Sequence, residues 1–280
     1  MSYAVRPTSS PISSSCSRNS AATRRNVSRA TTHRSSCSAP PLWHPGAMTT
    51  TLRTKISLGV QTASSSATSA SSEPGRDCPL CPRLVDYRLS VRAREPDWFN
   101  APVPSFGDSD AAVLIVGLAP GLQGANRTGR PFTGDYAGDL LYATLLKYGF
   151  AAGRYQARPD DGLKLVDCRI SNAVRCVPPQ NKPLPAEINT CRAFLSATLE
   201  AMPRLRAIVA LGRIAHDSAV KALGVRAAAA PFAHGAVHTA GGVKLYDSYH
   251  CSRYNTNTRV LTPQMFESVF AQVRADLTHR

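Results

Sequence analysis

The sequence predicts an α/β fold with a mostly parallel sheet, on two observations. Short runs of Val, Ile, Leu and Ala follow one another after Asp110, with the length and composition of buried parallel strands. Between these runs the apolar residues recur every three or four positions, which is the spacing of amphipathic helices. Strands that alternate with helices are typical of folds in which helices pack on a parallel sheet.

Each element has a recognisable start or stop. Gly149 and Gly224 lie where helices are expected to end. Pro185 suits the first turn of a helix, and Thr262 with Pro263 suits the N-cap and first position of another. The predicted strands are residues 111–117, 165–174, 206–212 and 243–250, and the predicted helices are residues 138–150, 185–202, 213–224 and 262–277.

The expected place for chemistry is the edge of the sheet where the parallel strands end. Ligands of such folds bind at the carboxyl ends of the strands. The segments that begin there are residues 117–135, 171–183, 212–216 and 250–258.

Positive charge is unevenly distributed along the 280 residues, which carry a formal net charge of +15. Residues 1–72 hold eight Lys and Arg, no acidic residue, and many Ser and Thr without apolar periodicity. Such a segment cannot bury enough apolar surface to offset its ordering entropy. We therefore expect a disordered basic arm over residues 1–75 and a folded catalytic domain over residues 76–280. The arm is a phosphate-binding extension, an organellar targeting segment, or the product of a start assigned upstream of Met48.

Composition excludes several classes of protein. No run of 18 or more apolar residues occurs, and the first residues contain no apolar core of a secretory signal. Eight cysteines are too few for a disulfide-stapled secreted domain. We expect no membrane partner and a reducing, cytoplasmic compartment, in which some cysteines bind metal.

The segment after the first predicted strand, residues 117–135, is a long glycine-rich loop. It lacks the G-x-G-x-x-G pattern and the Gly-Lys-Ser/Thr ending of common phosphate-binding loops, which argues against a nucleotide cofactor. Phe132 either stacks on a flat ring or anchors the loop in the core. Asp135 is either a catalytic carboxylate or the N-cap of the following helix.

Four cysteines have the spacing of a metal site. Cys78 and Cys81 form a C-x-x-C pair, Cys176 follows a predicted strand, and Cys191 lies in a predicted helix. Four thiolates suit either zinc or an iron–sulfur cluster, and four unrelated buried cysteines are the alternative. The lack of a second C-x-x-C argues against a zinc ribbon. Cys168 is expected to be a core residue.

One histidine is well placed for chemistry. His250 ends the fourth predicted strand, beside a loop rich in Ser, Asn and Arg. A hydrogen-bonded structural histidine is the alternative. His234 and His238 have no acidic or cysteine neighbour in the sequence, so we expect surface or structural positions, and we expect His216 to face the sheet edge.

Four segments together resemble the iron–sulfur uracil-DNA glycosylases, in particular their broad-specificity type-5 branch. They are GLAPGLQGANRTGRPFTGD (117–135), SNAVRCVPPQNKP (171–183), ALGRIAHD (210–217) and SYHCSRYNTNT (248–258). The resemblance covers residues 76–275. It implies a three-layer α/β/α sandwich with a central four-stranded, mostly parallel sheet.

The resemblance also implies an activity. The chain would hydrolyse the glycosidic bond of uracil, and of other deaminated or damaged bases such as hypoxanthine, in DNA. Asp135 and Asn172 would position and activate water, and His250 would donate to the uracil oxygen that gains charge. Lys182 is the only lysine in the four strand-end segments, so we expect no Schiff base and an intact abasic site as product.

The family's substrate contacts map onto a further set of residues. Phe132 would stack on the flipped base. Gly121 stands where stricter relatives carry a bulky Tyr, which implies a roomier pocket, and the apolar Ala119 provides no catalytic base. The full set is Gly117, Ala119, Gly121, Phe132, Ser252, Arg253 and Asn255.

The resemblance assigns the cysteines as well. Cys78, Cys81, Cys176 and Cys191 would hold a structural 4Fe–4S cluster. Cys251 departs from the family, which usually has Pro there, and this puts the rigidity of the loop in doubt.

The expected partner is DNA that contains uracil or other damaged bases, bound by a monomer associated with a bacterial-type nucleoid. A metal-containing nucleic-acid-binding module without catalysis is the alternative, and it needs neither Asp135 nor His250. An enzyme with a nucleotide cofactor is a third reading, but it requires a ribose-binding acid about 20 residues further on, at a strand end. Asp139 and Asp160 do not have that position.

Overall fold

The structure, a computed structural model, describes residues 72–278, so the predicted basic arm lies outside the described residues except at its end. Ser72 and Glu73 already contact the folded part. The carboxylate of Glu73 pairs with the guanidinium groups of Arg175, at 2.7 Å, and Arg169, at 3.2 Å. In this described part no helix is long and apolar enough to cross a membrane.

The central sheet has five strands, one more than the resemblance implies. In spatial order they are β4 (Cys168–Asn172), β1 (Val113–Gly117), β5 (Ala207–Leu211), β7 (Val243–Ser248) and β6 (Val237–Ala240). The first four are parallel, as predicted, and β6 pairs antiparallel with β7. Gly241 and Gly242, both at positive φ, form the two-residue turn of this hairpin. A Gly-Gly pair between two short apolar runs is itself a hairpin signal.

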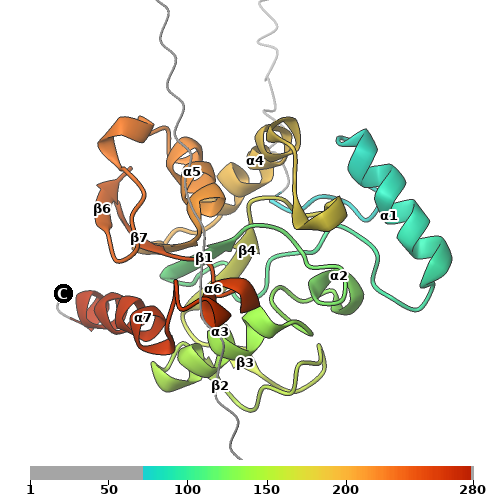
Figure 1. The fold of residues 1–280 in the computed structure, drawn as a ribbon. Coiled ribbons are helices and arrows are strands. Elements are labelled where there is room, and N and C mark those ends of the chain that lie inside the picture. Colours follow the sequence, from blue (N-terminus) through green and yellow to red (C-terminus); the bar gives the residue numbers. More distant parts are fainter. Residues whose placement is uncertain (1–71, 279–280) are drawn as a thin grey trace, which may run out of the picture. The chain divides into compact units, whose positions relative to one another are not determined.

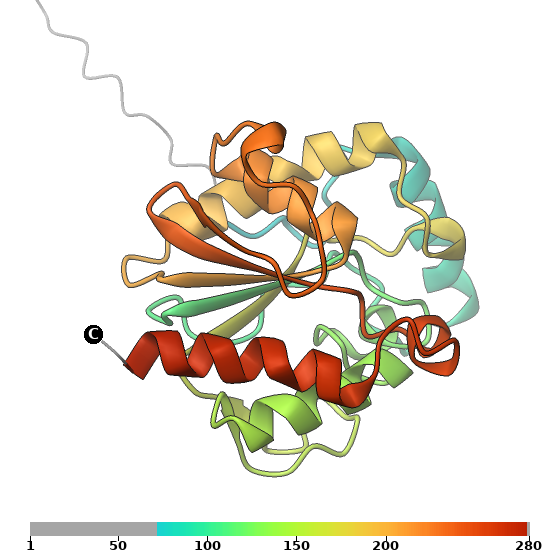
Figure 2. The same ribbon diagram turned by 60° about the vertical axis from the view of Figure 1, so that its left-hand side comes forward.

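Helices cover both faces of the sheet (Figures 1 and 2). On one face α4 (Pro185–Glu200) and α5 (Arg213–Ala222) pack on side chains such as Leu114 and Val116. On the other, α3 (Tyr136–Lys147) and α7 (Pro263–Thr278) pack on Val113 and Ile115. The alternation of side chains along β1 therefore supplies two separate cores. The predicted three-layer α/β/α sandwich is confirmed.

Several short elements differ from the prediction. The expected strand 165–174 is divided, because Leu165 belongs to a small hairpin and Asp167, at a φ of 50°, turns the chain before β4. Cys168 is buried in the core, as predicted. The unpredicted elements are helices α1 (Pro82–Arg94), α2 (Ala125–Thr128) and α6 (Arg253–Asn257), the 3₁₀ turns Pro179–Asn181 and Ala227–Ala229, and the hairpin of β2 (Ala151–Ala152) with β3 (Lys164–Leu165).

The parallel strands bring their carboxyl ends to one edge of the sheet. Gly117 at the end of β1 is in register with Asn172 at the end of β4. Gly212 follows β5, and the hydrogen bond from its N–H to the carbonyl of Ser248 joins it to the end of β7, two residues before His250. Segments that are far apart in sequence therefore meet at one place.

Candidate active site

A cavity of about 700 Å³ lies at this edge of the sheet. Its walls come from the segments that follow β1, β4 and β7. Of the ten predicted catalytic and substrate-binding residues, all but Gly117 and Asn255 line it: Ala119, Gly121, Phe132, Asp135, Asn172, His250, Ser252 and Arg253.

Phe132 lies both in the core and in the wall of the cavity. Its side chain is 7% exposed and belongs to the core beneath α3, yet its ring also forms part of the cavity wall. The ring lies against Gly117, where a Cβ atom would come 2.6 Å from Cζ, so a side chain at this position would displace the ring. The Phe132 and His250 rings lie 6.0 Å apart between centroids and 27° from parallel.

Asp135 occupies the N-cap position of α3 without using its side chain as a cap. The buried Oδ1 atom has no hydrogen-bond partner among the described residues, and Oδ2 faces Gly121 and Gly124. A Cβ at Gly121 would lie 2.8 Å from that oxygen, so the two glycines make room for the carboxylate. Burial raises the pKa of Asp135. The carboxylate is therefore available to a molecule in the cavity.

Asn172 ends β4 and is 3% exposed, with its side chain reaching the cavity. Its Oδ1 atom lies over the backbone of Gly117, where a Cβ would overlap it. A carboxamide offers both donors and an acceptor, which suits the edge of a base or a water molecule.

His250 is neutral at pH 7, because burial lowers its pKa to about 4. Its carbonyl accepts a hydrogen bond from Asn255 Nδ2 at 2.8 Å, and its Cβ packs over Gly212. Ser252 Oγ in turn accepts from the Asn255 N–H at 3.3 Å and caps α6. Asn255, predicted to touch substrate, thus lies behind His250 and braces its backbone.

The rim of the cavity carries exposed cationic and aromatic side chains. The guanidinium of Arg253 lies over the Tyr136 ring, 5.2 Å from its centroid. Tyr254, the next residue of α6, is 74% exposed. This combination suits a polyanion with flat bases.

Sequence reasoning missed other residues of the cavity wall, among them Gln123, Tyr136 and Asn181. Asn181 and its neighbour Gln180 both have positive φ values, 56° and 55°. Neither is glycine, and only Asn181 is of a residue type enriched in this conformation, so the local signal was weak. The polar composition of residues 171–183 was the available clue.

The four predicted cysteines meet around a second, small cavity. The buried guanidinium of Arg88 donates to Cys176 Sγ at 3.4 Å, and the Arg175 N–H donates to Cys191 Sγ at 3.3 Å. Burial raises the pKa of Cys176 to about 12 and that of Cys191 to about 11. No group of three or more His, Cys, Asp and Glu among residues 72–278 is arranged to hold a metal ion as it stands.

The remaining histidines correct two expectations. His216 is buried rather than at the sheet edge, with Nδ1 2.6 Å from Asp247 Oδ1 and Nε2 2.8 Å from the carbonyl oxygen of Ala230. His238 has an acidic partner after all, since its Nε2 lies 3.4 Å from Asp247 Oδ2. His234 Nδ1 accepts from the Tyr249 N–H. These contacts join β7 to its neighbours away from the cavity wall.

Comparison with known proteins assigns the chain to a family. The profile of the Uracil DNA glycosylase superfamily matches residues 104–274. The type-5 uracil-DNA glycosylase of Thermus thermophilus is 45% identical over 204 residues, which are 70% of this chain and 92% of that protein. The corresponding protein of Pyrobaculum aerophilum is 43% identical, over 71% of this chain and 89% of its own length. A type-4 uracil-DNA glycosylase of the same organism is 32% identical over 54% of this chain and 64% of its own. The chain belongs to the uracil DNA glycosylase superfamily.

Proposed function

We propose that this chain is a DNA repair glycosylase that hydrolyses the N-glycosidic bond of uracil in DNA and leaves an intact abasic site. One observation carries the proposal beyond the family match. The Asp135 carboxylate, whose Oδ1 atom has no partner among the described residues, the neutral ring of His250 and the ring of Phe132 face one cavity.

The substrate base reaches this cavity by leaving the duplex. Flipping a nucleotide costs a few kcal/mol, and stacking on an aromatic ring returns roughly 1–3 kcal/mol. Phe132 provides that ring. Asn172, whose Oδ1 atom also lies over Gly117, provides donors and an acceptor for the edge of the base.

His250 stabilises the leaving base. Cleavage of the glycosidic bond places negative charge on a uracil oxygen. A donor aimed at such an oxygen lowers the activation barrier by roughly 2.7–4 kcal/mol. Because the pKa of His250 is lowered to about 4, its ring donates as neutral imidazole. Asn255 holds the backbone of His250 and so fixes the direction of that donor.

Asp135 acts on the sugar side of the bond. Cleavage builds positive charge on the sugar, and an ionised carboxylate stabilises that charge and orients the attacking water. No lysine lines the cavity in the described domain, so the reaction proceeds through water rather than a Schiff base.

A broader choice of bases follows from Gly121. This position carries no side chain against the cavity, and bases larger than uracil, hypoxanthine among them, then fit. Any side chain there would also press on Asp135.

The cysteine site suits a structural 4Fe–4S cluster held by Cys78, Cys81, Cys176 and Cys191. The buried guanidinium of Arg88 donates to Cys176 Sγ and to the Cys78 carbonyl, and a buried cation needs a negative counter-charge. Four thiolates on a cluster provide it. The cluster would tie α1 to β4 and α4, apart from the chemistry.

We further propose that the enzyme acts as a monomer on chromosomal DNA in the cytoplasm, with Arg253 and Tyr254 against the duplex. A metal-containing binding module without catalysis is disfavoured, because it has no use for a buried carboxylate oxygen that lacks a partner among the described residues.

The test uses protein purified without oxygen and a labelled duplex with one uracil. Strand cleavage that appears only after alkali supports a monofunctional glycosylase, and a duplex with hypoxanthine then tests the wider range. A duplex that stays intact with iron-loaded protein would contradict the proposal.

A further inference from the structure

The segment 130–135 carries both Phe132 and Asp135, and its backbone is strained. Phe132 has a φ of 53°, in the left-handed region that is unfavourable for residues with a side chain. Such a conformation persists only where surrounding contacts hold it. In this domain those contacts come from outside the cavity, from α3 and from the loop between β2 and β3.

Two tyrosine hydroxyls hold successive carbonyls of the segment. Tyr142 donates to the carbonyl of Pro131 at 2.7 Å, and Tyr155 donates to that of Phe132 at 3.2 Å. The Pro131 carbonyl has a second donor, the hydroxyl of Thr133, at 3.2 Å. The Phe132 carbonyl accepts from Tyr155 alone among the described residues.

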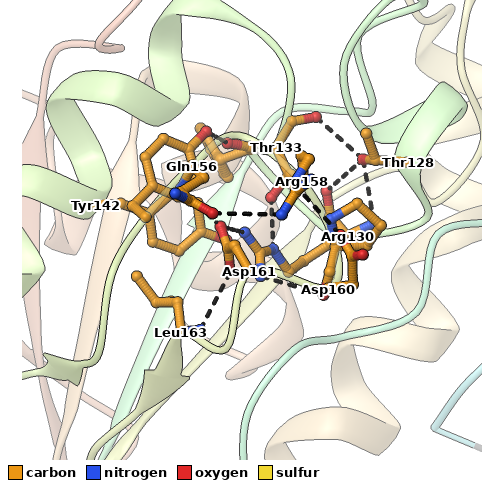
Figure 3. A network of polar contacts seen from close by, with 12 residues as sticks. Thr128, Arg130, Thr133, Tyr142, Gln156, Arg158, Asp160, Asp161 and Leu163 are labelled. Atoms are coloured by element: carbon orange, nitrogen blue, oxygen red, sulfur yellow. Dashed lines mark hydrogen bonds and ion pairs between the residues drawn. The ribbon is translucent and has the colours of Figure 1, made fainter.

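A buried ion pair fixes the two tyrosine rings. Both terminal nitrogens of Arg130 donate to Asp161, each at 2.8 Å, and Figure 3 shows this pair beside the Tyr142 ring. The guanidinium lies 5.4 Å from the Tyr142 centroid and 5.8 Å from that of Tyr155, and the two rings stack at 4.5 Å. Arg130 Nε also donates to Thr133 at 2.7 Å. Rings held in this way direct their hydroxyls with little freedom.

The same ion pair holds the loop that carries Tyr155. The Asp161 carboxylate accepts from the backbone N–H groups of Gln156, at 2.9 Å, and Leu163, at 3.1 Å. The Arg130 side chain beside it lowers the pKa of Asp161 far below its usual range. Asp161 therefore stays ionised, and the loop is closed on itself and on Arg130.

Gly138 in the first turn of α3 leaves space for the bond between Tyr155 and Phe132. A Cβ atom there would overlap the Phe132 carbonyl and lie 2.5 Å from the Tyr155 hydroxyl. The helix thus approaches this hydrogen bond closely, and its backbone covers it.

We propose that Tyr155 is a positioning residue for base excision, which acts by holding the Phe132 carbonyl and so the direction of the Phe132 ring beside His250. The inference rests on the proposed function, in which Phe132 stacks on the flipped base. Without the hydroxyl, the strained backbone at Phe132 would relax and the ring would turn from its place in the cavity wall.

The experiment compares Tyr155→Phe with Tyr142→Phe, because each variant removes one hydroxyl from the same stacked pair. The measurements are the single-turnover rate of uracil release from a duplex with one uracil, and Tm. We expect Tyr155→Phe to slow release by about 3- to 10-fold, the worth of one hydrogen bond. Tyr142→Phe should change the rate by less than about twofold, because the Thr133 hydroxyl still donates to the Pro131 carbonyl. Its Tm should fall by at least as much as that of Tyr155→Phe.

A double-mutant cycle then separates positioning from general stability. In a Phe132→Leu background the aromatic ring is gone, so Tyr155→Phe should cause no further loss of rate, although its effect on Tm remains. Equal rate losses in both backgrounds, or equal losses in the two tyrosine variants, would overturn the inference. A wild-type chain that releases no uracil would contradict the proposed function itself, and the inference with it.

Discussion

Two cavities of the described domain differ in how their polar groups are partnered. In the larger one, the side chains of Asp135 and His250 face open space, and the protein holds these residues through their backbones. In the cysteine site, Arg88 already donates to Cys176 Sγ. Groups that face open space in a cavity can act on a substrate, whereas thiols that converge in a small buried cavity link the elements that carry them. We therefore expect the first cavity to control rate and the second to control stability.

The largest effect on rate is expected from Asp135→Asn. The change keeps the shape of the side chain but removes the charge that stabilises the sugar cation and orients water. Single-turnover release of uracil should slow by about 10²- to 10⁴-fold, while the Kd for DNA stays within about threefold. A loss of affinity larger than the loss of rate would assign Asp135 to DNA binding instead.

Loss of the cysteine site should show the opposite behaviour. Cys176→Ser should give protein with less iron and weaker visible absorbance, destabilised by several kcal/mol, since a bound metal group contributes folding free energy. Cys168→Ser is the matched control for iron content, because Cys168 is also buried but lies in β4 outside the site. Normal iron content in Cys176→Ser would refute the ligand assignment.

Acid should slow the reaction in the first cavity. Burial raises the pKa of Asp135 and lowers that of His250 to about 4. Both residues are in their active forms above these values, so the single-turnover rate should be level near neutral pH. The rate should fall once the pH drops below the raised pKa of Asp135, and fall more steeply below the pKa of His250, about 4. Each protonation should reduce the rate by about tenfold per pH unit.

Circular dichroism at each pH provides the control for unfolding. A rate that rises on acidification through pH 6.5, the ordinary range of histidine, would show that imidazolium is the donor. His250→Ala should then remove that rise.

The smallest effect is expected at the rim. Arg253→Ala removes one exposed cation, so DNA affinity should fall modestly and the slope of log K against log salt should lose about 0.9 in magnitude. The single-turnover rate at saturating protein should be nearly unchanged. An unaltered salt dependence would place the DNA backbone elsewhere.

Local patterns were enough to place the main elements and most of the cavity. The four parallel strands and four long helices lie within a few residues of their predicted positions, because burial on both strand faces and helical periodicity are properties of short windows of sequence. Glycine and polar residues directly after the predicted strands likewise indicated a cavity at the edge of the sheet. The elements missed are short, like β6, or rich in charged residues, like α1, whose buried face includes Arg88.

Partnerships between distant residues could not be obtained in this way. Asp135 fits both an N-cap and a catalytic carboxylate by sequence, and its freedom from capping became visible only when Gly121 and Gly124 were placed beside it. The same holds for His216 with Asp247, and for Arg130 with Asp161.

The chain's own sequence thus determined the layered α/β fold, the edge at which chemistry occurs and the residue types available there. Folding decided which side chains were paired and which were left open, and it set the strained backbone of Phe132. The physical reason is that secondary structure depends on neighbours along the chain, whereas burial, pKa and hydrogen-bond partners depend on residues that the folded sheet and its helices bring together.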